Sequence, residues 1–236
     1  MFAIYACAVS REDPLSCLRV GEIELPSAPE GWVPVAVKAA SLNHHDIWSL
    51  KGQALSVERV PMILGSDAAG VTDGNREVIV HAVIGSSAGG DETLDTKRSL
   101  LSEVYPGTMA QQVYVPAGNL IDKPAELTWA EAACLPTAYL TAYRMIATKS
   151  ATSPGDTILV QGAAGGVATA LIVLGKALDR KVWVTSRTAD KREWAIGLGA
   201  DAAFETGERL PGKVDAVMET VGEATWDHSL KSLRPG

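Results

Sequence analysis

TILVQGAAGGVATALIVL, residues 157–174, is the stretch that decides the fold, because an apolar strand runs into a glycine-rich turn that opens a helix. Glycines let the backbone approach a pyrophosphate, and a helix N-terminus offers unpaired N–H groups and a positive dipole end. Read as GxGxxG, the pattern has alanine at positions 163 and 168, so the turn alone is a weak signal. We expect a dinucleotide pyrophosphate to lie against Ala164, Gly165, Gly166 and Val167.

Strands and helices alternate through the second half of the chain. The strand at 157–161 precedes a helix at 166–178, strand KVWVT, a helix at 190–198, short strand DAAF, strand VDAVM and a helix ending near Leu233. Such alternation predicts a Rossmann domain, a doubly wound parallel sheet with helices on its faces. These strands form a half-Rossmann unit that lacks the second mononucleotide half. We therefore expect this domain to be incomplete at its C-terminus and a poor catalyst that still binds the 2′-phosphate and ADP-ribose part of a cofactor.

The residues before 122 follow a different pattern. Short apolar runs such as FAIYACA and REVIVHAVI are separated by proline and glycine, which predicts a compact β-rich barrel or sandwich. We predict an α/β protein with a β-rich domain over residues 1–121 and the Rossmann domain over residues 122–236. Within this domain we predict a helix over residues 44–51 and a surface loop over residues 86–102.

Two helix signals follow residue 122. Thr128 and Glu131 have the spacing of a capping box, in which a hydroxyl and a carboxylate satisfy unpaired backbone N–H groups. Pro136 suits the first position of a second helix, which we predict to run through Tyr143.

Composition excludes several classes of protein. The net charge of −7 argues against a nucleic-acid or anionic-membrane partner, because binding phosphates requires clustered Lys and Arg. No apolar run reaches the length of a membrane helix, and the N-terminus lacks the features of a signal peptide, so we expect a cytoplasmic protein. The three cysteines are scattered, without the spacing of a disulfide framework or a zinc ribbon.

The second strand of the Rossmann pattern indicates which cofactor is bound. It ends at Ser186, 186 − 165 = 21 residues after Gly165, where the ribose-binding residue belongs. An NAD enzyme would have Asp or Glu there to accept from the ribose 2′-hydroxyl, whereas this chain has Ser186 and Arg187, followed by Lys191 and Arg192. Cations pair with a 2′-phosphate, so we predict NADPH. The alternative is a tight turn beside a solvated basic face.

Several segments together resemble the medium-chain dehydrogenase/reductase superfamily, and within it the zinc-free quinone and enone reductases. They are SLNHHDIWSLKG, MILGSDAAGV, PGTMAQQVYVPAGNL, EAACLPTAYLTAYRM, AAGGVA and VDAVMETVG, and they extend over nearly the whole chain. The resemblance implies a GroES-like barrel followed by the Rossmann domain.

The resemblance also implies that no catalytic metal is bound. Zinc-dependent members would have Cys at the position of Asn43, His-Glu at Ser66–Asp67 and Cys or Asp near Thr137, and none of these ligands is present. Asn and Ser are poor zinc ligands. The lobe that holds a structural zinc in some relatives would lie around residues 84–108, which contain no Cys.

Site residues follow from the resemblance position by position. His45 matches the hydroxyl residue that relays the substrate proton, and an imidazole there is suited to act as general acid near neutral pH. A histidine that only hydrogen-bonds, without chemistry, is the open alternative. Asn43 would bind the substrate or the nicotinamide ribose. The resemblance assigns cofactor contacts to His44, Thr137, Thr141, Thr220 and Val221.

A metal site built from His44, His45 and His81 is a weaker hypothesis, because adjacent residues rarely point toward the same ion. We therefore expect an NADP-dependent oxidoreductase that transfers hydride from NADPH to a quinone or conjugated carbonyl without zinc. The alternatives are a zinc-type alcohol dehydrogenase and a non-catalytic NADPH-binding fragment or sensor. A homodimer is left open.

Overall fold

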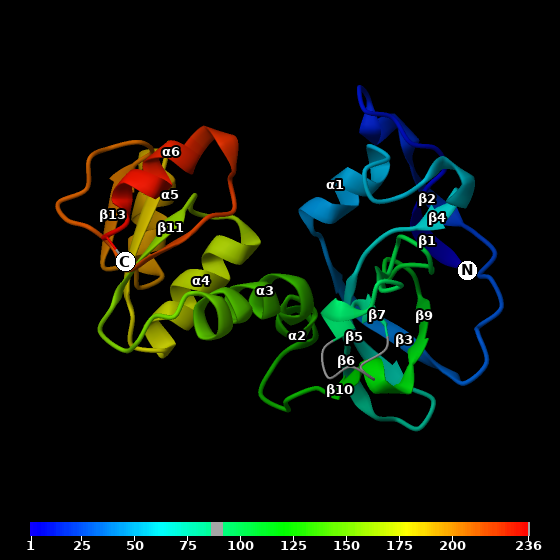
Figure 1. Ribbon diagram of the computed structural model, residues 1–236. Helices are drawn as coiled ribbons and strands as arrows, with labels where there is room; N and C mark the ends of the chain where they lie inside the picture. The colour runs from blue at the N-terminus through cyan, green and yellow to red at the C-terminus, as the bar shows by residue number, and fades with distance from the viewer. Residues whose placement is uncertain (86–91, 236) are drawn as a thin grey trace. The chain divides into compact units, whose positions relative to one another are not determined.

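The computed structural model describes residues 1–85 and 92–235 and contains two compact units, Met1–Thr137 and Ala138–Gly236. Each unit is described by itself (Figure 1). The sequence prediction divided the chain after residue 121. In the structure residues 122–137 lie in the first unit, because Ala132 and Ala133 of α2 (Trp129–Ala133) share a buried cluster with Ala69 and Ile79.

The first unit is built on a curled antiparallel sheet in the order β10-β6-β5-β3-β9. Alternate residues of these strands face one buried cluster that includes Val35, Val78, Val80 and Val113. Gly70 is required where β5 pairs with β3, because a Cβ there would lie 2.3 Å from the carbonyl oxygen of Ala36. The strands are β3 (Trp32–Ser41), β5 (Asp67–Thr72), β6 (Glu77–Val80), β9 (Gln112–Pro116) and β10 (Leu120–Asp122).

A smaller sheet in the same unit has the order β2-β1-β4. It is formed by β1 (Phe2–Ala6), β2 (Leu18–Glu22) and β4 (Met62–Ile63), and Leu50 of α1 (His44–Leu50) belongs to its buried cluster. The predicted helix at 44–51 is therefore confirmed. Short 3-10 helices are η1 (Pro14–Cys17), η2 (Val57–Arg59), η3 (Glu92–Leu94) and η4 (Ala117–Asn119).

The predicted loop at 86–102 is wrong in part. Residues 86–91 lie outside the described residues, but β8 (Ser99–Leu100) pairs with β7 (Val83–Ile84) as a two-stranded antiparallel ribbon. The sequence does not predict this strand, because a pairing of two residues is too short to leave an alternating pattern of polar and apolar side chains.

The helical segment after residue 128 begins as predicted and then differs. Thr128 and Glu131 form the capping box, with the Thr128 N–H donating to the Glu131 carboxylate at 2.9 Å. Pro136 does not begin an α-helix. It lies in a π-helical turn, η5 (Leu135–Tyr139), followed by α3 (Leu140–Tyr143) and a second π-helical turn, η6 (Arg144–Lys149).

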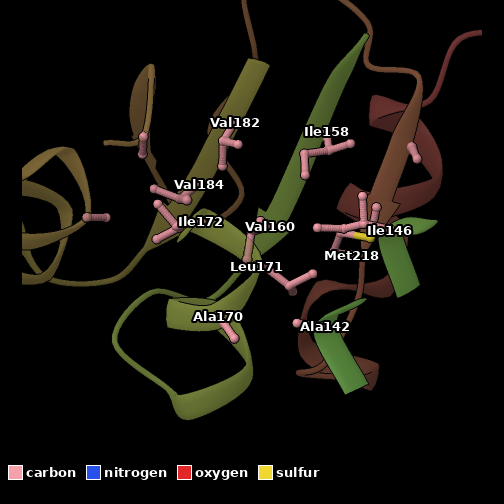
Figure 2. Close-up of a cluster of buried hydrophobic side chains, with 14 residues drawn as sticks. Ala142, Ile146, Ile158, Val160, Ala170, Leu171, Ile172, Val182, Val184 and Met218 are labelled. Atoms are coloured by element: carbon pink, nitrogen blue, oxygen red, sulfur yellow. The ribbon is translucent and has the colours of Figure 1, made fainter. Parts of the chain in front are cut away.

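The second unit contains a parallel sheet in the order β13-β12-β11-β14, which confirms the predicted Rossmann topology. Ile158 and Val160 of β11 lie beside Val182 and Val184 of β12 and against helix α4 (Figure 2). The strands are β11 (Thr157–Gln161), β12 (Lys181–Ser186), β13 (Ala202–Glu205) and β14 (Ala216–Met218). The helices are α4 (Gly166–Ala177), α5 (Ala189–Gly197) and α6 (Glu223–Ser232).

Helix α4 approaches the sheet closely at Gly175. A Cβ there would lie 2.7 Å from Val182 Cγ2 and 3.1 Å from Ile158 Cδ1. This contact fixes the helix whose N-terminus forms part of the predicted pyrophosphate turn. Among the described residues, no helix is long and apolar enough to cross a membrane.

Candidate functional site

A hollow of about 500 Å³ lies in the second unit, where the carboxyl ends of β11, β12, β13 and β14 meet the loops that follow them. Open parallel sheets bind ligands at this edge. Its basic side is formed by three predicted cofactor residues, Ser186, Arg187 and Lys191, and by the neighbouring Thr188. The other lining residues are Gly162, Ala163, Thr206, Val221, Ala224 and Thr225.

The turn from β11 to α4 has the conformation that the glycine-rich sequence predicts. Gly162 and Ala164 have positive φ angles of 79° and 65°, so the chain reverses sharply before the helix. Gly165 caps α4 without a side-chain hydrogen bond, which leaves the first amides of this helix available to an anion. Gly162 and Ala163 line the hollow. The predicted residues Ala164, Gly165 and Gly166 are exposed, Val167 is half-buried, and these four are not among the lining residues.

The basic side of the hollow contains two cations without partners. Arg187 and Lys191 are exposed, and neither makes a hydrogen bond or ion pair with another described residue. Arg192 differs, because its Nη1 donates to the carbonyl oxygen of Ser186 at 2.7 Å and holds the end of β12. Ser186 itself is buried. None of the described residues that line the hollow is acidic.

Glu219 organises the loop from β14 to α6 and was missed by the sequence analysis. Its carboxylate accepts from the N–H groups of Val221 at 2.7 Å and Gly222 at 3.0 Å, and from the hydroxyls of Thr225 and Ser229. Burial acts to raise the pKa of Glu219, but these hydrogen bonds outweigh it and lower the pKa. Val221 is thereby held at the hollow. Thr220, a predicted cofactor residue, is exposed and is not a lining residue.

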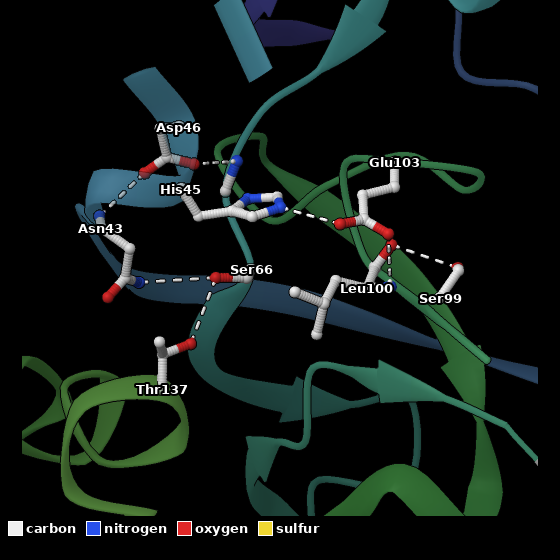
Figure 3. Close-up of polar contacts among 9 residues, drawn as sticks. Asn43, His45, Asp46, Ser66, Ser99, Leu100, Glu103 and Thr137 are labelled. Atoms are coloured by element: carbon white, nitrogen blue, oxygen red, sulfur yellow. Dashed lines mark hydrogen bonds and ion pairs between the residues drawn. The ribbon is translucent and has the colours of Figure 1, made fainter. Parts of the chain in front are cut away.

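A closed polar cluster occupies the first unit at the positions where zinc-dependent relatives would have their metal ligands. Asp67 is fully buried and accepts from Ser41 Oγ at 3.0 Å, Asn43 Nδ2 at 2.9 Å, Thr137 N at 3.2 Å and Thr137 Oγ1 at 2.6 Å. Ser66 Oγ lies 3.4 Å from Asn43 Nδ2 and 3.3 Å from Thr137 Oγ1 (Figure 3).

The donor set of this cluster does not suit zinc. A carboxylate has about four lone-pair sites, and protein donors already use most of those of Asp67, three on Oδ2 and one on Oδ1. The remaining side-chain groups are the amide of Asn43 and the hydroxyls of Ser41, Ser66 and Thr137, whereas zinc prefers thiolate, imidazole and free carboxylate. Among the described residues, no group of three or more His, Cys, Asp or Glu side chains could hold a metal ion.

Helix α1 presents His44 and His45 in different environments. His44 is exposed and packs edge-on against Trp48, with ring centroids 5.1 Å apart. His45 is 11% exposed, and its Nε2 lies 2.9 Å from Glu103 Oε1. Its Nδ1 is buried without a hydrogen-bond partner in the described structure. His81 pairs instead with Glu92, so the three histidines do not assemble a common site.

Asp46 fixes the start of this helix. It accepts from the N–H groups of Asn43 at 2.8 Å and Gly65 at 3.1 Å (Figure 3). Burial raises the pKa of Asp46, and the two hydrogen bonds and the nearby His45 oppose that rise. Asn43 and His45 are therefore held on one short, well-anchored turn. Thr141, the remaining predicted residue, lies exposed on α3 in the second unit.

A second hollow, of about 520 Å³, lies in the first unit and is lined mainly by apolar and aromatic residues. None of the predicted site residues lines it. The volume of a hollow therefore does not identify the site. The predicted cofactor residues line the hollow at the edge of the parallel sheet.

Comparison with known proteins identifies the family. Residues 29–125 match the family model described as the alcohol dehydrogenase GroES-like domain. A probable quinone oxidoreductase of Schizosaccharomyces pombe is 34% identical, over 97% of this chain and 68% of that protein. The chain belongs to the medium-chain dehydrogenase/reductase family. A crotonyl-CoA carboxylase/reductase of Cereibacter sphaeroides is 33% identical, over 98% of this chain and 62% of that protein. The chain thus spans less than two thirds of that relative's length.

Solved structures agree with this assignment. An NAD-dependent alcohol dehydrogenase has a TM-score of 0.90 and 31% identity, with 99% of this chain and 74% of that chain covered. The quinone oxidoreductase from Thermus thermophilus, solved also with NADPH, has a TM-score of 0.78 and 28% identity, with 100% and 72% covered. One of these proteins is named as NAD-dependent and the other was solved with NADPH, so the comparisons do not decide between the two cofactors for this chain.

Proposed function

We propose that this protein is an NADPH-dependent reductase that transfers hydride to a quinone or a conjugated carbonyl compound without catalytic zinc. The observation that carries the proposal is the basic side of the hollow after β12. Arg187 and Lys191 have no partners among the described residues there, and no acidic side chain lines the hollow.

The charge of the hollow supports the proposal of a phosphorylated dinucleotide over an unphosphorylated one. A 2′-phosphate carries nearly two negative charges, and a guanidinium can donate two parallel hydrogen bonds to it. An NAD-binding site would instead have a carboxylate that accepts from the ribose 2′-hydroxyl. The uncapped N-terminus of α4 is suited to the pyrophosphate. When bound, NADPH would supply the hydride, and Thr141, Thr220 and Val221 remain proposed contacts to it.

Reduction of either substrate class also requires a proton. Hydride addition to the β-carbon of an enone leaves an enolate, and hydride addition to a quinone leaves a hydroquinone anion, so each product takes up one proton. His45 is our proposed source, because it is the largely buried imidazole on the anchored turn of α1. Asn43, held by its bonds to Asp67 and Ser66, is proposed to orient the substrate or the nicotinamide ribose.

The experiment is NADPH oxidation with menadione and with cyclohexenone, on protein dialysed against a chelator and analysed for zinc. We expect turnover with NADPH that exceeds turnover with NADH and that does not change when zinc is removed or added. Activity that depends on about one bound zinc per chain would favour the zinc-type alcohol dehydrogenase. Tight NADPH binding without turnover of any such acceptor would favour a sensor or binding fragment.

Arg187→Ala is the diagnostic variant, and Arg209→Ala is its matched control. Arg209 is an exposed arginine of the same unit that does not line the cofactor hollow. Loss of NADPH-dependent activity in the Arg187 variant alone supports the proposal. Equal loss in both variants would contradict it.

A further inference from the structure

A further hollow, of about 360 Å³, lies in the second unit, where the loop from β13 to β14 faces α6. Loop residues between 207 and 213 line one side, and the C-terminal half of α6 lines the other. This basic hollow is separate from the hollow proposed for the cofactor, because the two share no lining residue. The proposed function therefore gives it no role.

Three cations line the basic hollow without compensating charge. Arg209 and Lys213 come from the loop and Lys231 from α6, and all three are exposed. Lys213 Nζ donates to the backbone carbonyl of Lys231, and none of the three forms an ion pair with a described carboxylate. None of the described residues that line the basic hollow is acidic, although the chain as a whole has a net charge of −7. Cations gathered in a hollow in this way attract an anion.

The carboxylate within the same loop is directed to another contact. Glu208 Oε2 accepts from the N–H of Glu205 at 2.9 Å, and Glu208 does not line the basic hollow. Its backbone carbonyl accepts from His228 Nε2 at 2.8 Å, and His228 Nδ1 accepts from Nε2 of the buried Gln161 at 2.9 Å. These contacts join the loop to α6 and α6 to the end of β11, so the two sides of the basic hollow are held relative to each other.

The loop adds backbone donors and an apolar surface to the cations. Gly207, with a positive φ of 85°, and Gly212 both line the basic hollow, and neither N–H donates to a described residue. Cations and unpaired N–H groups together suit the oxygens of a phosphate. Leu210 and Pro211 also line the basic hollow and offer an organic group a surface to pack against. Its volume lies within the range of roughly 300–1,000 Å³ that is usual for small-molecule sites.

We propose that the basic hollow binds a small organic phosphate monoester, at a site separate from the nicotinamide cofactor. Arg209 donates hydrogen bonds to the phosphate oxygens, Lys213 and Lys231 balance their charge, and Leu210 and Pro211 contact the organic group. A phosphate monoester carries about −1.5 to −2 charges at pH 7, which matches three cations better than the single charge of a carboxylate does. The site and the cofactor hollow use different residues, so either proposal can fail without the other.

The test is an NMR titration of the whole chain, labelled with ¹⁵N, at one fixed ionic strength. The probes are phenyl phosphate, inorganic phosphate and benzoate, and the amide signals of Gly207 and Gly212 report on the basic hollow. We expect saturable shifts with phenyl phosphate, weaker binding of inorganic phosphate, and no saturation with benzoate. The double variant Arg209→Ala/Lys231→Ala should bind phenyl phosphate about tenfold or more weakly. Lys181→Ala, which removes an exposed lysine outside the basic hollow, is the matched control and should bind as the wild type does.

Two results would overturn the site itself. One is the absence of saturable shifts at Gly207 and Gly212, including the case in which only Gly165 and Gly166 of the cofactor turn respond. The other is equal binding by the double variant and the wild type, with unchanged β11 and β12 signals as the check that the variant is folded. Inorganic phosphate or benzoate bound as tightly as phenyl phosphate would overturn the assignment of an organic phosphate monoester.

Discussion

Replacing Asp67 tests whether the polar cluster stabilises the first unit through the hydrogen bonds that this carboxylate accepts. In Asp67→Ala, the four donors that converge on this buried carboxylate lose their acceptor. The hydroxyls of Ser41 and Thr137 can rotate to other acceptors. The Thr137 N–H cannot, because the backbone fixes it, and the Asn43 amide keeps only its long 3.4 Å contact with Ser66 Oγ, so one of its N–H groups loses its acceptor.

The expected cost follows from these two stranded donors. A buried donor left without a partner costs about 1–3 kcal/mol, so Asp67→Ala should lower the free energy of unfolding of the first unit by about 2–6 kcal/mol. Domains are stable by only about 5–15 kcal/mol, so the loss is a large share. Asp67→Asn should cost less than half as much. Its oxygen can take the Oδ2 position, which accepts from Ser41, Asn43 and the Thr137 N–H.

Hydrogen exchange read by mass spectrometry separates the two units. Peptides from β3 and β5 should lose protection in Asp67→Ala, and peptides from β11 and β12 should not change. Asp122→Ala is the control, because Asp122 is 78% exposed in a surface ion pair and such pairs contribute about 0–1 kcal/mol. Full protection of β3 and β5 in Asp67→Ala would refute the reasoning that the cluster closes on this carboxylate.

Three further changes have defined outcomes. Arg187→Ala should weaken NADPH binding about ten- to a hundredfold, the value of a charge-assisted hydrogen bond, and leave NADH binding nearly unchanged; titration calorimetry of both cofactors checks this. Glu219 has a lowered pKa in the folded chain, so its contribution to stability is present above the ordinary pKa of a glutamate and is lost as pH falls through the lowered value. The melting temperature of Glu219→Gln should therefore fall less on acidification than that of the wild type, and parallel curves would contradict this. Gly70→Ala should destabilise the first unit by about 1–3 kcal/mol through the contact of its Cβ with Ala36, whereas Gly21→Ala, with open space around it, should not; urea unfolding measures both.

Local signals in the sequence predicted the elements that local interactions determine. The turn before α4 follows from its glycines, the start of α2 follows from Thr128 and Glu131, and the parallel sheet follows from the alternation of strands and helices. Pro136 suits the first position of an α-helix, but it lies within a π-helical turn, which its own preference does not predict.

Contacts over long sequence separations could not be predicted in this way. Glu103 is 58 residues from His45, and nothing in its neighbourhood marks it as a partner of an imidazole. The bonds of Asp67 to Thr137 extend over 70 residues. The sequence analysis also did not name Thr206 and Thr225 as site residues. Thr206 directly follows β13, and Thr225 lies in the first turn of α6, after the loop that follows β14. Their places after strands of the parallel sheet could have marked them as lining residues.

The most direct test of the account is the relative affinity of the wild-type chain for NADPH and NADH, measured by titration calorimetry at one fixed ionic strength. The central claim is that Arg187 and Lys191, unpartnered among the described residues, read a 2′-phosphate at the end of β12. We predict that NADPH binds about ten- to a hundredfold more tightly than NADH, and that the difference narrows as salt screens the charges. Equal affinities, or tighter binding of NADH, would contradict the account.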